Sequence, residues 1–304
     1  MRKVLIYIAA LLMPVLASAQ ALPFVSADYS AGALARAGAA STETSSTAFA
    51  AFDNVAAVPY SEKAADVSVG YTIWQPNSIS LNAILAGGSY NLNNKLGFAL
   101  GMTYGMYPEY EIFSEQGSEK GTFKPSDIQI KAGASMRFLP FLSAGVSLGY
   151  ASSSLAEGVS YGAFEADVFL MSKFADYKVA VGVSDLGSAV LSASDVKFAL
   201  PTAATLGLGY EKAFTELHRV DVGLDADYYF AGAFAASAGA EYTFKDMISF
   251  SAGYRYGGES VIPSYASFGL GGSFAGVRLD LAYVIPVANS AMSNTLSLAV
   301  GYSF

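Results

Sequence analysis

The C-terminal end of the chain alternates large and small side chains with a strict two-residue period. In its last eleven residues, NTLSLAVGYSF, every second position from Leu296 to Phe304 is large and apolar, and the positions between carry Thr, Ser, Ala and Gly. This period is typical of a β-strand with one apolar face and one small polar face. A strand that ends at a free terminus has an unpaired edge, so we expect another strand to cover it.

The same alternation recurs along most of the chain and predicts an all-β fold. The weakest segment lies at 79–92, where the apolar positions change parity and indicate a bulge near Asn82 and Ala83. We expect about fourteen strands, an even number that returns both chain ends to one side of a membrane. The alternating segments are 67–73, 79–92, 96–106, 128–138, 144–150, 164–170, 179–183, 206–210, 220–228, 234–244, 248–256, 266–274, 277–285 and 296–304.

Charged residues in these segments lie on the face opposite to the large apolar residues. A Lys or Arg at the lipid-facing midplane of a barrel costs roughly 2–4 kcal/mol, whereas the lumen tolerates it. We therefore expect the apolar face to point outward and the charged face inward. The charged residues are Lys131, Arg137, Glu165, Asp167, Glu211, Asp221, Asp225, Asp227, Glu241, Arg255, Arg278 and Asp280.

The composition also favours a membrane protein. Of the 304 residues, 14% are charged, against about 25% in typical soluble domains, and the mean hydropathy is +0.38. Beyond the N-terminal leader no segment has the pattern of a spanning helix, and only helices and closed barrels satisfy their backbone groups in hydrocarbon. The sequence thus predicts a transmembrane antiparallel β-barrel of about fourteen strands with a small N-terminal plug segment. The net charge of −8 argues against a nucleic-acid partner, and the absence of cysteine excludes disulfides and thiolate metal sites.

The N-terminus has the pattern of a signal peptide. Two basic residues, Arg2 and Lys3, precede an apolar stretch at 4–16 and the small triplet Ala17-Ser18-Ala19. We expect cleavage after Ala19 and export of the mature chain; an uncleaved membrane anchor is the alternative. The predicted organisation is a signal peptide at 1–19, a plug segment at 20–64 and a barrel at 65–304.

Connections between the predicted strands alternate in length. Tight turns such as Asn93-Asn94 and Lys245-Asp246 alternate with longer segments at 108–126, 153–160 and 187–200. Short turns on the periplasmic side and long loops outside are typical of outer-membrane barrels.

The segment at 20–64 is rich in small residues but also carries Phe49, Phe52 and Val55. It is too apolar for a free tail, although a disordered periplasmic tail is the alternative interpretation. The small residues on the predicted inward faces leave room for a segment inside the barrel. We therefore expect a plug that occludes the lumen.

Several runs in and after this segment resemble the N-terminal signature of FadL-type outer-membrane barrels, and are most similar to the PorV/PorQ family associated with type IX secretion. They are ALARAGAA at 33–40, AF at 48–49, DNVAA at 53–57, DVSVGY at 66–71, and Trp74. The family's Asn-Pro-Ala or Asn-Ala-Ala element is Asn54-Val55-Ala56 here. The resemblance implies fourteen strands, an N-terminal plug and the outer membrane of a Gram-negative bacterium. The candidate plug residues are Arg36, Gly38, Phe49, Phe52 and Asn54.

Carboxylates cluster on two neighbouring strands. Such groups are able to perform acid/base chemistry or hold a hard cation, but charges that balance one another inside the lumen explain them more simply. Arg137 is a further candidate counter-ion. The lone His218 beside a turn supports neither a metal site nor a catalytic triad, so we expect no enzyme, metal or cofactor. The predicted lumenal charge network comprises Glu211, Asp221, Asp225, Asp227, Arg255, Arg278 and Asp280.

The aromatic residues suggest further roles. Trp74 and several tyrosines fit anchoring at the membrane interface, with ligand recognition by Trp74 as the alternative. Tyr302 and Phe304 resemble the terminal signal that the outer-membrane insertion machinery recognises.

Three functions are open at this point. The resemblance implies a non-catalytic barrel that serves protein secretion or surface attachment by binding secretion-system proteins or secreted cargo through its loops. The alternative is FadL-like transport of a small hydrophobic compound, which binds beneath the loops and leaves sideways through the wall into outer-membrane lipid. A structural or enzymatic barrel is the third.

Overall fold

The computed structural model describes residues 22–75, 80–114, 117–188, 190–191, 197–257, 262–287 and 292–304. The predicted signal peptide at 1–19 lies outside these residues. Within the described ranges no helix is both long and apolar enough to cross a membrane.

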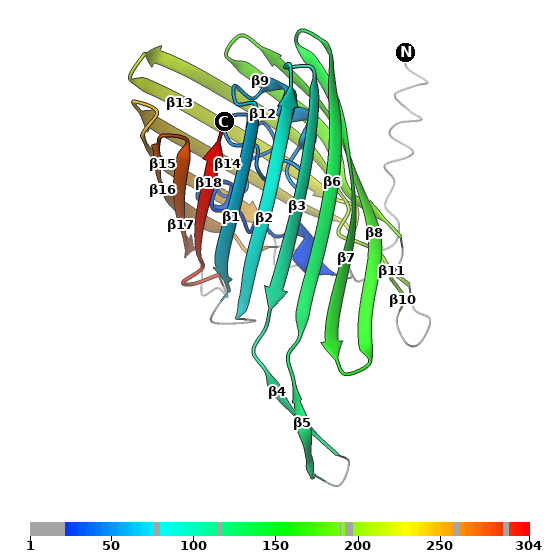
Figure 1. Cartoon of the computed structure of the whole chain (residues 1–304). Helices are drawn as coiled ribbons and strands as arrows, with labels where there is room; N and C mark the ends of the chain where they lie inside the picture. The colour runs from blue at the N-terminus through cyan, green and yellow to red at the C-terminus, as the bar shows by residue number, and fades with distance from the viewer. Residues whose placement is uncertain are drawn as a thin grey trace.

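Fourteen strands of the described chain form one closed antiparallel barrel, which confirms the predicted fold class (Figure 1). Each strand pairs with its neighbour in chain order, apart from two short hairpins outside the barrel sheet. β4 (Tyr110–Phe113) and β5 (Glu119–Phe123) project from the barrel, whereas β10 (Val190–Leu191) and β11 (Lys197–Phe198) lie next to β8 (Figure 1). The barrel strands are β1 (Ala65–Trp74), β2 (Leu81–Leu92), β3 (Leu96–Met106), β6 (Ser126–Leu139), β7 (Leu142–Ala156), β8 (Val159–Phe174), β9 (Tyr177–Gly187), β12 (Ala203–Thr215), β13 (His218–Tyr229), β14 (Ala233–Phe244), β15 (Ile248–Gly257), β16 (Tyr265–Phe274), β17 (Val277–Pro286) and β18 (Leu296–Ser303).

Strands β1 and β18 close the barrel. Their register runs without interruption from Asp66 opposite Ser303 to Ile73 opposite Leu296. Beyond it, the backbone N–H of Phe304 donates to the Ala65 carbonyl at 2.9 Å. The C-terminal strand therefore has the partner that its pattern requires.

The two faces of the wall differ as the alternation predicts. Large apolar side chains point outward, including Leu148 at 63% exposure and Phe164 at 70%, whereas the inward Lys131 is only 2% exposed. An apolar outer face and a charged interior are the arrangement of a barrel that spans lipid.

The tight turns lie where the sequence places them. Asn93 and Asn94 have φ of 55° and 53°, and Lys245 and Asp246 have φ of 55° and 52°, as two-residue hairpin turns require. We call this end of the barrel the turn end and the opposite end, which carries β4–β5 and β10–β11, the loop end. The predicted long loop at 153–160 is wrong, because β7 and β8 pair as far as Ala156 and Val159.

The bulge expected near Asn82 and Ala83 is also wrong. Strand β2 keeps one register with β1 and with β3 along its whole length. The parity of its apolar residues changes because Leu81 and Leu85 point inward and pack in a buried apolar cluster. An apolar contact inside the lumen thus produced a false sign of a bulge.

Residues 22–64 fold inside the barrel, and we call them the plug segment (Figure 1). The segment contains η1 (Pro23–Ser26), the short helix α2 (Ala31–Ala35) and η2 (Val55–Tyr60). Inward glycines of the wall give it space: a Cβ on Gly133 would lie 2.9 Å from Cγ2 of Val55, and one on Gly239 would lie 2.7 Å from Cβ of Arg36. These distances are too short for a larger residue, so the glycines allow the segment to pack against the wall.

Deletion of Phe304 tests the importance of the C-terminal closure. The deletion removes the backbone pair with Ala65 and an exposed aromatic side chain that contacts Tyr302 edge to face, with 4.6 Å between ring centroids. We expect less heat-modifiable, membrane-assembled protein on gels of outer-membrane fractions, and near-normal assembly of Phe304→Tyr, which keeps the aromatic ring. Unchanged assembly of the deletion variant would contradict the prediction.

Candidate functional site

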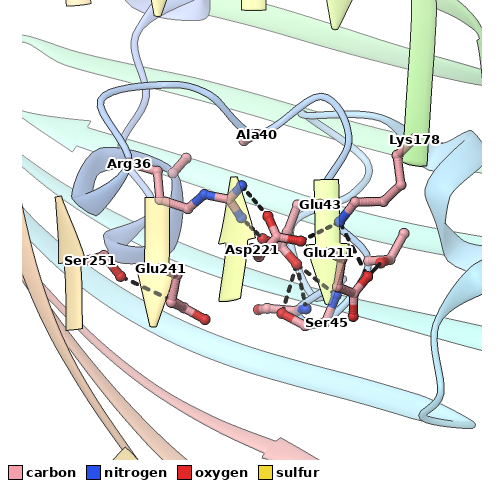
Figure 2. Close-up of polar contacts among 12 residues, drawn as sticks. Arg36, Ala40, Glu43, Ser45, Lys178, Glu211, Asp221, Glu241 and Ser251 are labelled. Carbon is pink, nitrogen blue, oxygen red and sulfur yellow. Dashed lines mark hydrogen bonds and ion pairs between the residues drawn. The ribbon is translucent and has the colours of Figure 1, made fainter. Parts of the chain in front are cut away.

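A buried ion-pair cluster joins the plug segment to the wall (Figure 2). Arg36 follows α2 directly and pairs with Glu43 of the plug segment and with Asp221 of β13. Lys178 of β9 pairs with Asp221 and, at 3.3 Å, with Glu211 of β12. Since single buried charges are costly, each member depends on the others.

The pKa of Glu43 reflects this arrangement. Burial raises the pKa, but Arg36 and Lys178 lower it more, so that it falls from 4.5 to about 2. A carboxyl group with a lowered pKa contributes stability that is fully present above pH 4.5 and is lost as the pH falls through about 2. The Arg36–Glu43 pair therefore stabilises the internal structure of the plug segment at neutral and mildly acidic pH.

Asp225 of β13 anchors the plug segment through neutral donors. Its carboxylate accepts the backbone N–H groups of Ala40 and Ser41 at 3.0 and 2.9 Å and the Ser41 hydroxyl at 2.6 Å. Asn54 then closes the next turn, since its side-chain oxygen accepts the N–H of Ala56 and its nitrogen donates to the Ser41 carbonyl. These bonds hold residues 40 and 41 against β13 and tie Asn54 to them.

The predicted lumenal network is divided into separate groups. Asp227 lies 3.6 Å from Arg255, and Asp280 lies 2.8 Å from Arg278, so neither arginine balances Asp221. Arg137 lies outside the carboxylate groups, with its guanidinium 5.1 Å from the ring centre of Tyr60.

Two cations and a carboxylate carry interactions that the predicted network lacks. Lys178 balances Asp221, and Lys131 pairs with Asp167 at 2.8 Å and with Asp185 at 2.9 Å. The alternation already placed Lys131 on the inward face, and Lys178 lies on the inward parity of β9, so the same pattern could have identified it. The alternation could not predict the position of Asp185, because the pairing of β9 with β8 shifts register next to this residue and its φ is 54°.

The remaining candidate plug residues pack against the wall. Phe49 lies against Gly87 and Phe52 against Gly101, both inward glycines of β2 and β3. Gly38 has φ of 85°, and a Cβ there would lie 2.9 Å from the Arg255 guanidinium, so a larger residue fits neither the backbone nor the space.

An apolar cluster fills the loop end of the lumen, and we call it the loop-end cluster. Trp74 belongs to it at 3% exposure, with its ring 5.3 Å from that of Tyr29, so the expectation of a membrane-interface anchor is wrong for this residue. Trp74 lies on the inward parity of β1. Phe198 of β11 packs against the cluster from the loops. Its members include Leu22, Phe24, Tyr29, Trp74, Leu85, Leu200 and Ile262.

The features considered for catalysis are not assembled into a site. His218 is hydrogen-bonded through Nδ1 to the hydroxyl of Tyr242 at 2.6 Å, near the turn end. Across the described residues, no group of three or more His, Cys, Asp or Glu side chains has the arrangement of a metal site.

Comparisons with known proteins identify the fold. No protein-family model matches the sequence, and no curated protein matches it. The toluene transporter TodX of Pseudomonas putida is similar with a TM-score of 0.66 at 15% identity, over 90% of this chain and 97% of that one. The toluene transporter TbuX of Ralstonia pickettii is similar with a TM-score of 0.62 at 10% identity, over 90% of this chain and 97% of that one. A Pseudomonas aeruginosa FadL homologue is similar with a TM-score of 0.54 at 13% identity, over 90% of this chain and 98% of that one.

These likenesses establish a FadL-type barrel fold. They do not extend to the PorV/PorQ family, and that resemblance stays a prediction.

Replacement of Arg36 by Met tests whether the ion pairs hold the structure together. It leaves the buried Glu43 and Asp221 carboxylates short of a cation, so we expect the free energy of unfolding to fall by about 3–5 kcal/mol. The matched control is Arg219→Met at the exposed turn-end pair with Asp246, which is expected to cost less than about 1 kcal/mol. Urea unfolding in phospholipid vesicles measures both, and equal losses would contradict the prediction.

Proposed function

We propose that this protein is a non-catalytic outer-membrane barrel that passes a small hydrophobic compound across the outer membrane. The observation that carries the proposal is the loop-end cluster, an apolar region to which Val190 of β10 belongs and against which Phe198 of β11 packs. The fold supports it, because similar solved structures are described as toluene transporters. Secretion has no such support from the comparisons.

The charged lumen limits the route that such a compound takes. Below the loop-end cluster the compound would meet the buried ion pairs of Lys131 and Lys178, which offer an apolar molecule no favourable contacts. We therefore place its exit through the wall, into the apolar part of the membrane. The strongest candidate is the loop end of β9, where pairing with β12 stops at Ser184 and the side chain of Leu200 covers Gly187.

Protein docking through the loops is a second candidate function. The β4–β5 hairpin extends well beyond the barrel rim and exposes Tyr110 at 40% and Phe113 at 57% (Figure 1). Exposed aromatic side chains on a projecting hairpin are typical of contact surfaces. A secretion-system protein or secreted cargo that co-purifies with the wild type, but not with a variant lacking residues 109–124, would support this function.

Uptake by whole cells tests the transport proposal. Cells that express the protein are expected to take up labelled toluene faster than cells that lack it. Phe198→Ser removes an apolar contact of the loop-end cluster and should bring the uptake rate close to that of cells without the protein.

The matched control is Phe214→Ser, which alters an exposed phenylalanine at the turn end of β12 and should leave uptake unchanged. Equal uptake with and without the protein would overturn the transport proposal.

A further inference from the structure

A cavity of about 130 Å³ lies between the plug segment and the wall, just below the loop-end cluster. Its lining includes the aromatic and apolar residues Tyr29, Phe49, Phe52, Leu85 and Phe169. Tyr29, Phe49 and Leu85 also belong to the loop-end cluster. A molecule that has reached the cluster therefore borders directly on this cavity.

The same lining is also rich in acidic residues. Five aspartates line it, Asp28, Asp53, Asp185, Asp225 and Asp227, against two cations, Lys131 and Arg255. Three of the aspartates have partners described above. Asp28 and Asp53, both from the plug segment, have no hydrogen bond or ion pair with any described residue. The cavity therefore has more acidic than basic side chains in its lining, and two of its carboxyl groups have no hydrogen-bond or ion-pair partner.

The electrostatics of these two carboxylates favour a positive guest. Burial raises the pKa of Asp53 well above its ordinary value, and the charges of Asp28, Glu43 and Asp225 raise it further. Burial likewise raises the pKa of Asp28. A cation placed between them would lower both pKa values by stabilising the ionised forms.

A second observation shows that the cavity is not built for a pure hydrocarbon. Arg255 is 3% exposed and lines the cavity, but its terminal nitrogens donate to the hydroxyls of Ser237 and Tyr229, and neither makes an ion pair with Asp28 or Asp53. The cavity thus leaves the carboxyl groups of Asp28 and Asp53 as unpaired acceptors. Unsatisfied buried polar groups of this kind are usually met by a polar ligand or by water.

We propose that this cavity binds a small organic cation, an amine of single-ring size whose apolar part contacts the aromatic lining residues and whose ammonium group lies between Asp28 and Asp53. The inference rests on the proposed function, because the guest reaches the cavity through the loop-end cluster. It names the substrate class more narrowly: carboxylates such as fatty acids are repelled by the aspartates. The cavity volume of about 130 Å³ limits the guest to a single ring, since a cavity of about 150 Å³ accommodates benzene.

Four ligands with one ring and different polar groups test the proposal: benzylamine, benzyl alcohol, toluene and benzoate. They are titrated into the detergent-solubilised full barrel in a calorimeter, with detergent alone as the blank. We expect benzylamine to bind about tenfold more tightly than toluene. A desolvated cation near aromatic rings and carboxylates gains about 1.4 kcal/mol, which corresponds to a tenfold change in affinity. Benzoate should bind most weakly. Equal affinities of benzylamine and toluene, or no binding of benzylamine, would overturn the proposal.

Two variants locate the site. Asp28→Asn and Asp53→Asn keep the shape of the side chain and break no hydrogen bond to a described residue, so both are expected to fold. Each substitution should weaken the binding of benzylamine about five- to tenfold, because it removes one desolvated charge interaction, and should leave the affinity for toluene unchanged. Asp246→Asn, at the exposed turn end, is the control and should bind benzylamine normally. If the control lost as much affinity as Asp53→Asn, the effect would come from the overall charge of the protein, and the proposed position of the site would be wrong.

The two proposals fail in different ways. Toluene uptake by cells without any preference for benzylamine in the calorimeter would overturn this inference and leave the transport function standing. Uptake that is equal with and without the protein would overturn the transport function itself.

Discussion

Closure of the backbone hydrogen bonds is the constraint on which the rest of this structure depends. In hydrocarbon an unpaired N–H or C=O group has no water to bond, so a sheet in lipid cannot keep an open edge. Here β18 meets β1 in unbroken register, and the backbone of Phe304 extends the seam as far as Ala64 and Ala65. The closed wall then divides every strand into a lipid face and a lumen face, and all further features follow from that division.

A charged lumen face creates its own requirement, because buried charges need partners. The wall supplies some, as in Lys131 with Asp167, and the plug segment supplies others. Arg36 contributes the cation that faces Asp221, and the amides of Ala40 and Ser41 satisfy Asp225. The plug segment and the wall thus stabilise each other, and wall glycines such as Gly239 allow the two to approach closely enough to do so.

The two-residue period explains why the fold could be predicted and where prediction stopped. Parity assigns each side chain to a face. Trp74 and Lys178 lie on the inward parity of their strands, although the prediction placed Trp74 at the membrane interface and did not name Lys178. Parity does not say which inward groups meet, because partners such as Arg36 and Asp221 are far apart in the sequence and depend on how the plug segment folds. The inward position of Asp185 depends on a register shift between β8 and β9, which a periodic pattern cannot predict. The apparent bulge in β2 arose because the lumen near Leu81 and Leu85 is apolar, against the general rule of a polar interior.

That exception has a functional consequence, since the lumen changes character along its axis. Apolar side chains such as Trp74 and Ile262 fill the loop end, and ion pairs fill the middle. A purely apolar molecule is stable in the first region only, and a strongly hydrated ion only in the second. The border between them combines the ring of Phe52 with the unpaired carboxylate of Asp53. A guest that is stable at this border therefore has both an apolar body and a polar, positive end, and this border is the point in the lumen at which the barrel is able to select by chemistry as well as by size.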